Sequence, residues 1–137
     1  FITGSKDSPR KDLGKALEKE LFSEGKLVYY LGIGSVVYGV DADLVDSKLL
    51  VHSRKEHIRR LTEVAHIMLD AGMIFIMSAR ELNADDFDVI RTGIHDEKIS
   101  VIWVGEERTT DIPVTLHIED PYDMEDCVKL IREQLDV

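Results

Sequence analysis

The sequence predicts an α/β fold, a three-layer α/β/α sandwich in which helices cover both faces of a mostly parallel sheet. Short apolar runs typical of buried parallel strands recur along the chain, at residues 26–31, 73–78, 99–104 and, more weakly, 113–118. Segments with helical periodicity separate most of these runs, and they are long enough for right-handed crossovers between parallel strands. With a first strand ending at Phe1 and Ile2, the expected order is β-α-β-α-β-α-β-β-α.

The first two helices are marked at both ends. The first carries apolar residues four positions apart, namely Leu13, Leu17 and Leu21. We expect it to open at Ser8 and Pro9, a capping residue followed by proline at the first helical position, and to stop at Gly25. The second is expected to open with a capping box at residues 53–56 and to end at Gly72.

The other two helices are predicted from their N-terminal residues. One begins near Asn83, which has Asp86 three residues on, and the other begins near Asp123. Their buried residues follow helical spacing: Phe87, Ile90 and Ile94 in one, and Val128, Ile131 and Leu135 in the other. Each helix therefore presents one apolar face to the sheet.

Size and charge limit the function. The 137 residues are the usual size of one domain, so we expect a single domain over residues 1–137. No apolar run reaches the ~18 residues of a membrane span, and a soluble, cytoplasmic protein is expected. The single Cys127 lies in a helical pattern and is expected to be a structural thiol. The net charge of −10 repels polyanions, so nucleic acids and anionic membranes are not expected as partners.

The segment GSKDSPRK, residues 4–11, has the length of a phosphate-binding loop. Such a loop (Walker A, G-x-x-x-x-G-K-[ST]) turns backbone N–H groups onto phosphates, while its Lys reaches the terminal phosphates and its hydroxyl binds Mg²⁺. Here Pro9 stands at the second glycine, Arg10 at the lysine and Lys11 at the hydroxyl. Because proline lacks an N–H and arginine is bulkier than lysine, the motif is degenerate. Taken alone, the loop is more simply interpreted as an ordinary helix start.

Four longer stretches resemble the adenylylsulfate (APS) kinase family, whose enzymes phosphorylate the 3′-hydroxyl of adenosine 5′-phosphosulfate. They are ITG with the following ALEKEL, then EGKLVYYLGIGSVVYGVDADL, RKEHIRRLTEVAHIMLDAGMIFIMSA and the closing MEDCVKLIREQL. The register holds without a large gap from Ile2 to about Arg91. The resemblance implies the P-loop kinase fold and a place in sulfate activation, where such domains are commonly fused to a sulfate adenylyltransferase.

Most of the chemistry that the resemblance would bring is absent. The family's DGDNVR segment, whose Asp and Arg are expected to engage substrate, corresponds to GIGSVV at residues 32–37. Arg54 and Arg59 stand where the family has arginines, but the family's Asn corresponds to His57. After residues 99–104 the family continues through a base-binding and lid segment, whereas residues 105–111 here lead directly to the next apolar run. The resemblance therefore implies a kinase domain whose lid is deleted.

Other patterns indicate no further site. Gly32 and Gly34 follow a strand, but the third glycine of a dinucleotide-binding turn is missing. The five histidines lack paired zinc-ligand spacing, so surface or capping roles are expected. Asp41, Asp43 and Asp46 lack the Gly and Glu of a calcium loop, and we expect them to be solvated.

The combined interpretation is a catalytically degenerate APS-kinase-like domain. Because the sequence begins with Phe1 and not with Met, we expect it to be the C-terminal part of a longer chain. It would act as a regulatory, dimerisation or docking module of a sulfate adenylyltransferase. Loss of the lid should expose apolar surface near Trp103, so a homodimer or a docked partner is expected. Residual APS kinase activity and a pure scaffold without ligand remain alternatives.

A vestigial site for sulfate, phosphate or an adenylyl nucleotide is expected at the start of the first helix, because free N–H groups and the helix dipole favour anions there. The residues assigned to it are Gly4, Ser8, Arg10, Lys11, Arg54 and Arg59. The two arginines of the second helix are included because the resemblance places that helix beside the same cleft. No catalytic residue, cofactor or metal is expected.

Overall fold

The structure, a computed structural model, describes residues 1–36, 39–44, 50–95 and 98–137. In this part of the chain a single sheet has five parallel strands in the order β2-β3-β1-β4-β5. The strands are β1 (Ile2–Gly4), β2 (Val28–Gly32), β3 (Ile74–Ser78), β4 (Ile102–Val104) and β5 (Leu116–Ile118). The predicted α/β class and the predicted order of elements are confirmed.

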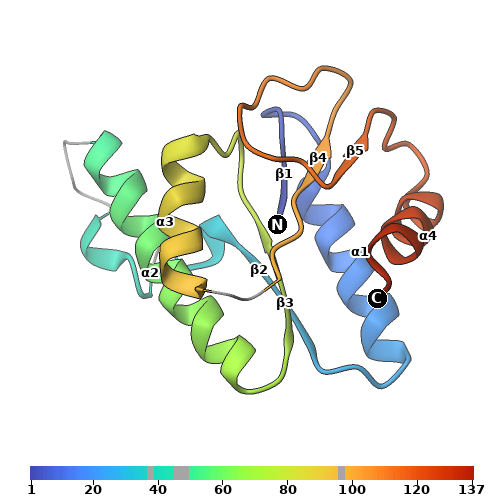
Figure 1. Cartoon of the computed structure of the whole chain (residues 1–137), viewed down its shortest axis with the longest axis horizontal. Helices are drawn as coiled ribbons and strands as arrows, with labels where there is room; N and C mark the ends of the chain where they lie inside the picture. The colour runs from blue at the N-terminus through green and yellow to red at the C-terminus, as the bar shows by residue number, and fades with distance from the viewer. Residues whose placement is uncertain (37–38, 45–49, 96–97) are drawn as a thin grey trace.

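Helices cover both faces of the sheet (Figure 1). The α-helices of the described residues are α1 (Arg10–Ser23), α2 (Leu50–Asp70), α3 (Ala84–Ile94) and α4 (Met124–Leu135). Two short 3₁₀ helices, η1 (Ile33–Val36) and η2 (Ala42–Leu44), lie between β2 and α2. Helices α1 and α4 pack on one face, and α2 and α3 on the other. Each face has its own core, because successive strand residues point to opposite sides: Ile76 packs with α1 and α4, and Met77 with α2 and α3.

The helix ends confirm some predictions and correct others. Asn83 caps α3 in a reciprocal capping box with Asp86, and the side chain of Asp123 caps α4, as predicted. The capping box predicted at residues 53–56 is wrong, because α2 begins at Leu50 and these residues lie inside the helix.

The start of α1 also differs from the prediction. Pro9 occupies the N-cap position instead of the first helical position, and no side chain caps the helix. The hydroxyl of Ser8 donates to the carbonyl oxygen of Ser5 at 2.8 Å, back into the loop. The predicted end of the helix is confirmed, because Gly25 follows it with a positive φ of 81°.

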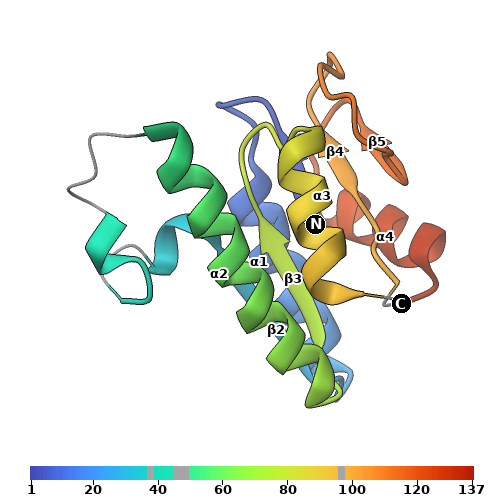
Figure 2. The ribbon, with the colours of Figure 1, turned by 60° about the vertical axis from the view of Figure 1, so that its left-hand side comes forward.

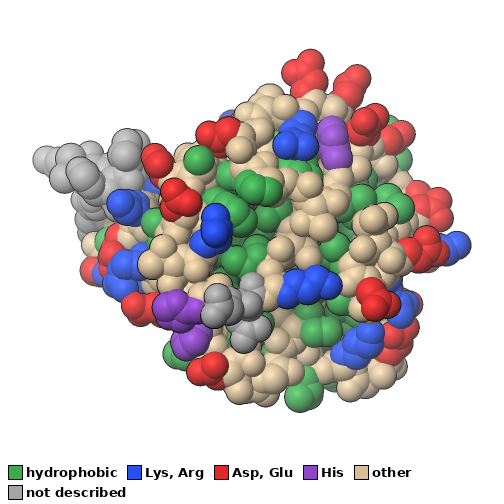
Figure 3. Space-filling view, in the orientation of Figure 1, with side chains coloured by type: hydrophobic (Ala, Val, Ile, Leu, Met, Phe, Trp, Pro, Cys, Tyr) green, Lys and Arg blue, Asp and Glu red, His purple; other side chains and the backbone are tan. Residues whose placement is uncertain are grey.

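Because the strands are parallel, their carboxyl ends meet at one edge of the sheet, where open α/β folds bind ligands. Figure 2 shows the loops that follow β1, β3 and β4 gathered at this edge, at the top of the view. Acidic side chains stand along the rim of the molecule in Figure 3, in keeping with its net charge. Among the described helices, none is long and apolar enough to cross a membrane.

Candidate functional site

The loop between β1 and α1, residues 5–9, lies at the carboxyl edge of the central strand β1. Gly4, the last residue of β1, has a φ of 159°, and a Cβ built on it would lie 2.1 Å from the carbonyl oxygen of Val104. The strand therefore requires glycine here, since any side chain would collide with the backbone of β4. This close packing brings the loop directly over the central strands.

The loop is closed on itself. The carbonyl oxygen of Ser5 accepts hydrogen bonds from the amide and the hydroxyl of Ser8, at 3.2 and 2.8 Å, and from Nη1 of Arg10. Nη1 of Arg10 also donates to the Ser8 hydroxyl at 2.6 Å. A phosphate-binding loop turns N–H groups inward, whereas here an inward carbonyl is covered by the loop's own arginine. The side chain that corresponds to the phosphate-binding lysine is thus bound to the loop itself.

Positive charge gathers around this loop. Burial lowers the pKa of Arg10, and the charge of the neighbouring Arg80 lowers it further, while Glu81 raises it. Lys6 and Lys11 are exposed, and within the described part of the chain neither makes an ion pair. An anion at this edge would meet four cations, Lys6, Arg10, Lys11 and Arg80, on a protein that is acidic overall, although Asp7, Asp12 and Glu81 offset part of this charge.

The segment after β3, residues 79–82, lies beside this loop at the carboxyl edge of the sheet. The amide of Glu81 donates to the carbonyl of Gly4 at 3.0 Å, and Glu81 has a φ of 46°, which is uncommon for a residue with a side chain. The amide of Leu82 donates to the hydroxyl of the fully buried Thr3 at 3.0 Å. These bonds hold residues 79–82 against β1, so this segment is part of the packed core.

Arg54 lies at this edge but is held by other residues. Its guanidinium binds the buried carboxylate of Asp86, with Nη2 to Oδ2 at 2.9 Å, and donates to the carbonyl of Arg80 at 2.8 Å. Asp86 is in turn the capping-box residue of α3. Arg54 therefore joins α2 to α3 and to residues 80–81.

Arg59 lies on a different face of α2. It lies five positions after Arg54, which at about 100° per residue places the two side chains about 140° apart around the helix. The guanidinium of Arg59 pairs with Glu56 and Glu63 on the same helix, at 2.8 and 2.5 Å. The structure thus brings Gly4, Ser8, Arg10 and Lys11 together, places Arg54 beside them, and leaves Arg59 elsewhere.

Beneath the edge, β2 and β3 are joined by a buried polar pair. The hydroxyls of Tyr30 and Ser78 lie 2.6 Å apart, and burial raises the pKa of Tyr30. Gly32 and η1 continue from β2, in the place of the family's acidic segment, and offer no carboxylate. The sequence did not single out Tyr30 or Ser78, because a tyrosine in an apolar strand ordinarily serves packing.

The short connection after β4, residues 105–115, is pinned to the edge. The indole N–H of Trp103 donates to the carbonyl of Glu107 at 3.0 Å, and the hydroxyl of Thr110 donates to the carbonyl of Leu82 at 2.8 Å. Trp103 is fully buried. The expectation of exposed apolar surface near Trp103 is therefore wrong, because this connection itself covers the indole.

In the acidic segment, Asp41 differs from expectation. Asp41 was expected to be solvated, but it is buried and its carboxylate contacts Nδ1 of His57 on α2. Asp43 is exposed and pairs with Arg60 at 2.6 Å, and Asp46 lies outside the described residues. No group of three or more potential metal ligands occurs in the described part of the chain.

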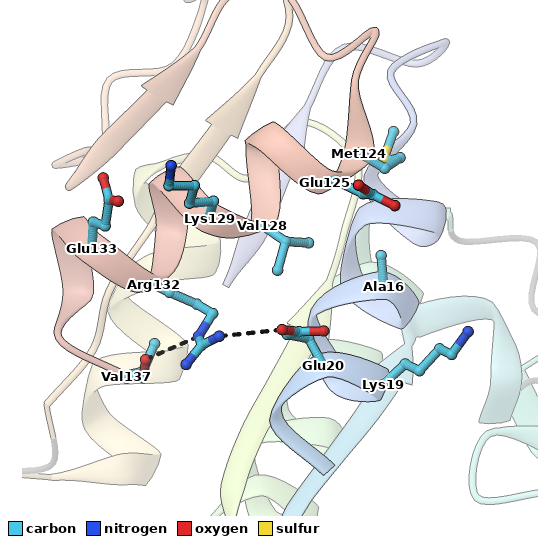
Figure 4. Close-up of a pocket in the computed structure, with 10 residues that line it drawn as sticks. All are labelled: Ala16, Lys19, Glu20, Met124, Glu125, Val128, Lys129, Arg132, Glu133 and Val137. Atoms are coloured by element: carbon cyan, nitrogen blue, oxygen red, sulfur yellow. Dashed lines mark hydrogen bonds and ion pairs between the residues drawn. The ribbon is translucent and has the colours of Figure 1, made fainter. Parts of the chain in front are cut away.

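A separate groove of about 790 Å³ lies between α1 and α4 (Figure 4). Its floor includes Ala16 and Val128, and its rim alternates in charge. The charged rim residues are Lys19, Glu20, Glu125, Lys129, Arg132 and Glu133. Arg132 spans the groove to Glu20 at 3.3 Å, so the two helices are linked across it.

Comparison with known proteins identifies relatives of this arrangement. The sequence profile of the adenylylsulphate kinase family matches residues 1–112. The adenylyl-sulfate kinase of Staphylococcus epidermidis is 33% identical over 103 residues, which cover 75% of this chain and 50% of that protein. The chloroplastic adenylyl-sulfate kinase 2 of Arabidopsis thaliana is 33% identical over 132 residues, which cover 96% and 41%. The chain thus spans about half the length, or less, of these relatives.

Longer proteins and solved structures extend the comparison. The bifunctional enzyme NodQ of a Rhizobium species is 36% identical over 96 residues, which cover 62% of this chain and 14% of NodQ. The APS kinase CysC of Mycobacterium tuberculosis, solved in complex with AMPPNP and APS, matches with a TM-score of 0.85 at 18% identity, over 100% of this chain and 96% of that one. A hexameric APS kinase from Thiobacillus denitrificans matches with a TM-score of 0.79 at 20% identity, over 98% and 28%. At these identities the solved structures show the shared fold, and the sequence matches show that the chain belongs to the adenylylsulphate kinase family.

Proposed function

We propose that this chain is a catalytically degenerate member of the family and acts as a regulatory and docking module of a sulfate adenylyltransferase, as a domain of a longer protein. The observation that carries the proposal is the hydrogen bonding of Arg10 to Ser5 and Ser8 inside the loop. A kinase needs its loop cation and inward N–H groups free to hold phosphates, because phosphoryl transfer depends on positioning and charge neutralisation. Here the cation and the loop hydroxyl are bound to each other.

The remaining parts of the edge support the same conclusion. Lys11 stands where a hydroxyl would bind Mg²⁺, and a second cation there opposes metal binding. Residues 32–36 carry no acidic side chain, and residues 105–115 are packed over Trp103 where a lid would begin. The elements that would position ATP, metal and the acceptor hydroxyl are thus altered in different ways: by a cation at Lys11, by the absence of acidic side chains in residues 32–36, and by structural contacts of residues 105–115.

The regulatory function would be the weak binding of an anionic effector at this edge of the sheet. The N-terminus of α1 and the side chains of Lys6, Arg10 and Lys11 favour sulfate, phosphate or the phosphate of an adenylyl nucleotide. Arg10 would have to turn from Ser5 to contribute. We expect dissociation constants on the order of millimolar, because a few exposed charge-assisted contacts add only a few kcal/mol.

Calorimetric titration tests the anion site. Sulfate, APS and its 3′-phosphorylated product are titrated into the wild type, the double variant Arg10→Ala, Lys11→Ala, and the control Lys15→Ala, which removes an exposed charge one turn further along α1. The proposal predicts binding that needs no Mg²⁺, is weakened at least about fivefold in the double variant, and is unchanged in the control. Identical binding by all three proteins, or no binding by any, would remove the regulatory function.

The groove between α1 and α4 is the proposed docking surface. The protein carries a net charge of −10, but the rim of the groove carries equal numbers of acidic and basic side chains. An acidic surface of an adenylyltransferase would therefore be repelled less at this groove than by the rest of the molecule. NodQ, in which the matched region covers only 14% of the length, supports a setting within a larger protein.

A binding assay tests the docking function. Binding to the sulfate adenylyltransferase of the same genome is measured for the wild type, for Lys129→Glu in the groove and for Lys15→Glu outside it. Docking through the groove predicts that Lys129→Glu weakens binding at least about fivefold, whereas Lys15→Glu, with the same change in net charge, does not. Equal effects of the two variants, or no binding by the wild type, would contradict it.

A further inference from the structure

Three hydroxyl groups converge on the backbone of Gly32, at the carboxyl end of β2. Gly32 has no side chain, and a Cβ built on it would have hydroxyl oxygens as its three nearest heavy atoms outside the neighbouring residues of the chain. They belong to Tyr30, Ser35 and Ser78, at 3.0, 3.6 and 3.7 Å from that position. These three side chains, from β2, η1 and β3, are called the hydroxyl cluster below.

The hydroxyl cluster has a hydrogen-bond donor to spare. The bond between the hydroxyls of Tyr30 and Ser78, which lie 2.6 Å apart, uses only one of their two protons. Neither hydroxyl makes another hydrogen bond within the described residues, and the hydroxyl of Ser35 makes none there. Tyr30 and Ser78 are only 9% and 7% exposed, so bulk water has little access to the free proton. Because a buried donor without an acceptor is costly, the hydroxyl cluster favours a ligand that supplies an acceptor oxygen.

A ligand can reach the hydroxyl cluster from the carboxyl edge of the sheet. Gly32 is half-buried and Ser35 is exposed, so the approach lies over these two residues. Residues 32–36 carry no charged side chain that would repel an anion. The cluster is therefore a buried donor site with an uncharged entrance.

Positive charge from the loop of residues 5–9 and the start of α1 lies near the hydroxyl cluster. The ring of Tyr30 packs against Gly14, and Arg10 lies four residues before Gly14, on the same side of α1. Burial raises the pKa of Tyr30, whereas its hydrogen bond with Ser78 and the charge of Arg10 lower it, so the guanidinium acts on the phenol. An anion between them would meet donors on one side and a cation on the other.

We propose that the hydroxyl cluster forms the inner part of the anion site and donates a hydrogen bond to one oxygen of a tetrahedral oxyanion, sulfate in particular, while Arg10, turned away from Ser5, neutralises its charge. Sulfate fits because it only accepts hydrogen bonds, and the cluster supplies donors and no carboxylate. The inference rests on the proposed anion site, and it adds the class of ligand and the residues beneath the loop that recognise it. The same chemistry could come from inorganic sulfate or from the phosphosulfate group of APS.

Calorimetric titration of inorganic sulfate at constant ionic strength tests the role of the hydroxyl cluster. Tyr30→Phe removes the phenolic hydroxyl and keeps the ring, and Gly32→Ala fills the space between the three hydroxyls. Each variant should weaken sulfate binding at least about fivefold. The matched controls should bind as the wild type does: Tyr29→Phe alters the neighbouring, exposed tyrosine, and Gly34→Ala places a Cβ where nothing lies within 4 Å.

A second measurement uses the wild type alone, so it does not depend on the folding of a variant. In amide NMR spectra, sulfate should shift the resonances of Gly32 and Ser35, and the dissociation constant from these shifts should agree with the calorimetric one. The amide of Gly72, after α2, should not move. APS is titrated in parallel, and shifts of Gly32 and Ser35 with APS but not with sulfate would overturn the assignment of sulfate.

The outcomes separate this inference from the proposed function. Sulfate binding that is weakened in the double variant Arg10→Ala, Lys11→Ala but is equal in Tyr30→Phe and the wild type would overturn the role of the hydroxyl cluster and leave the anion site in place. Equal losses in Tyr30→Phe and Tyr29→Phe would overturn that role as well. No binding of sulfate or APS by the wild type would overturn both the anion site and this inference.

Discussion

The ring of Tyr30 lies directly against the backbone of Gly14. A Cβ built on Gly14 would come within 2.3 Å of Cε2 of Tyr30, and the phenol continues to the hydroxyl of Ser78 at 2.6 Å. The glycine thus leaves space on α1 for a side chain of β2. This contact between Gly14 and Tyr30 packs α1, and with it the loop before α1, against the sheet.

Gly14→Ala should therefore destabilise the protein, although alanine is ordinarily the better helix former. We expect a loss of about 1–3 kcal/mol in the free energy of unfolding, because the added methyl group overpacks the Tyr30 ring. Gly34→Ala is the matched control, since a Cβ there meets nothing within 4 Å. Chemical denaturation of both variants measures the effect; equal stability of Gly14→Ala and the wild type would mean that the ring moves aside freely.

The two arginines of α2 should differ in their effect on stability. Arg54→Ala leaves the buried carboxylate of Asp86 without its cation and should cost about 1–3 kcal/mol. Arg59→Ala removes a half-exposed side chain and pairs that lie on the surface, and should cost less than about 1 kcal/mol. Thermal unfolding of the two variants distinguishes them. A larger loss for Arg59→Ala would mean that the interpretation of Arg54 as a structural residue is wrong.

Acid should selectively remove the contribution of Glu56. Its folded-state pKa is lowered to about 2 by hydrogen bonds from Arg59 and Arg60, compared with an ordinary value of 4.5. A depressed carboxyl pKa stabilises the fold above the unfolded value, and that stabilisation disappears as the pH falls from 4.5 toward 2. Urea unfolding should thus show Glu56→Gln to be less stable than the wild type near neutral pH, with the difference shrinking over this acidic range. A difference that does not change with pH would contradict the linkage.

The thiol of Cys127 should react slowly. Burial raises its pKa, as do the carboxylates of Asp123, Asp126 and Asp120, so little thiolate forms at neutral pH. Alkylation by iodoacetamide near pH 8 should be at least about tenfold slower in the folded protein than in the urea-unfolded protein. Comparable rates in the two states would show that the side chain is accessible.

The elements and the family could be predicted from the sequence because they depend on local signals and on long matched stretches. The strands lie almost entirely within the predicted apolar runs, and Asn83 and Asp123 cap their helices through side chains a few residues from their targets. Periodicity and capping act over short distances, so a single sequence contains them.

Two of the failures involve contacts between residues distant in the sequence, and the other two involve backbone carbonyls of loops, which no side-chain pattern describes. Asp41 meets His57 across 16 positions, and Arg54 meets Asp86 across 32, so neither pair forms a local pattern. Trp103 was expected near exposed surface, because its cover, the turn through Glu107, could not be distinguished from a truncated lid. Arg10 is predicted to bind an anion, but it binds the carbonyl oxygen of Ser5, whose direction depends on the backbone conformation of the loop.

The central proposal is that the loop of residues 4–11, in a chain of the adenylylsulphate kinase family, does not support phosphoryl transfer. The most direct test is the rate of 3′-phosphorylation of APS by the purified chain with ATP and Mg²⁺, measured at high protein concentration by direct detection of the product. The account predicts turnover below ~0.1 s⁻¹, about a tenth of the low end of ordinary kinase rates. A rate above that value, abolished by Arg10→Ala or Lys11→Ala, would show that the loop still acts as a kinase site and would contradict the account.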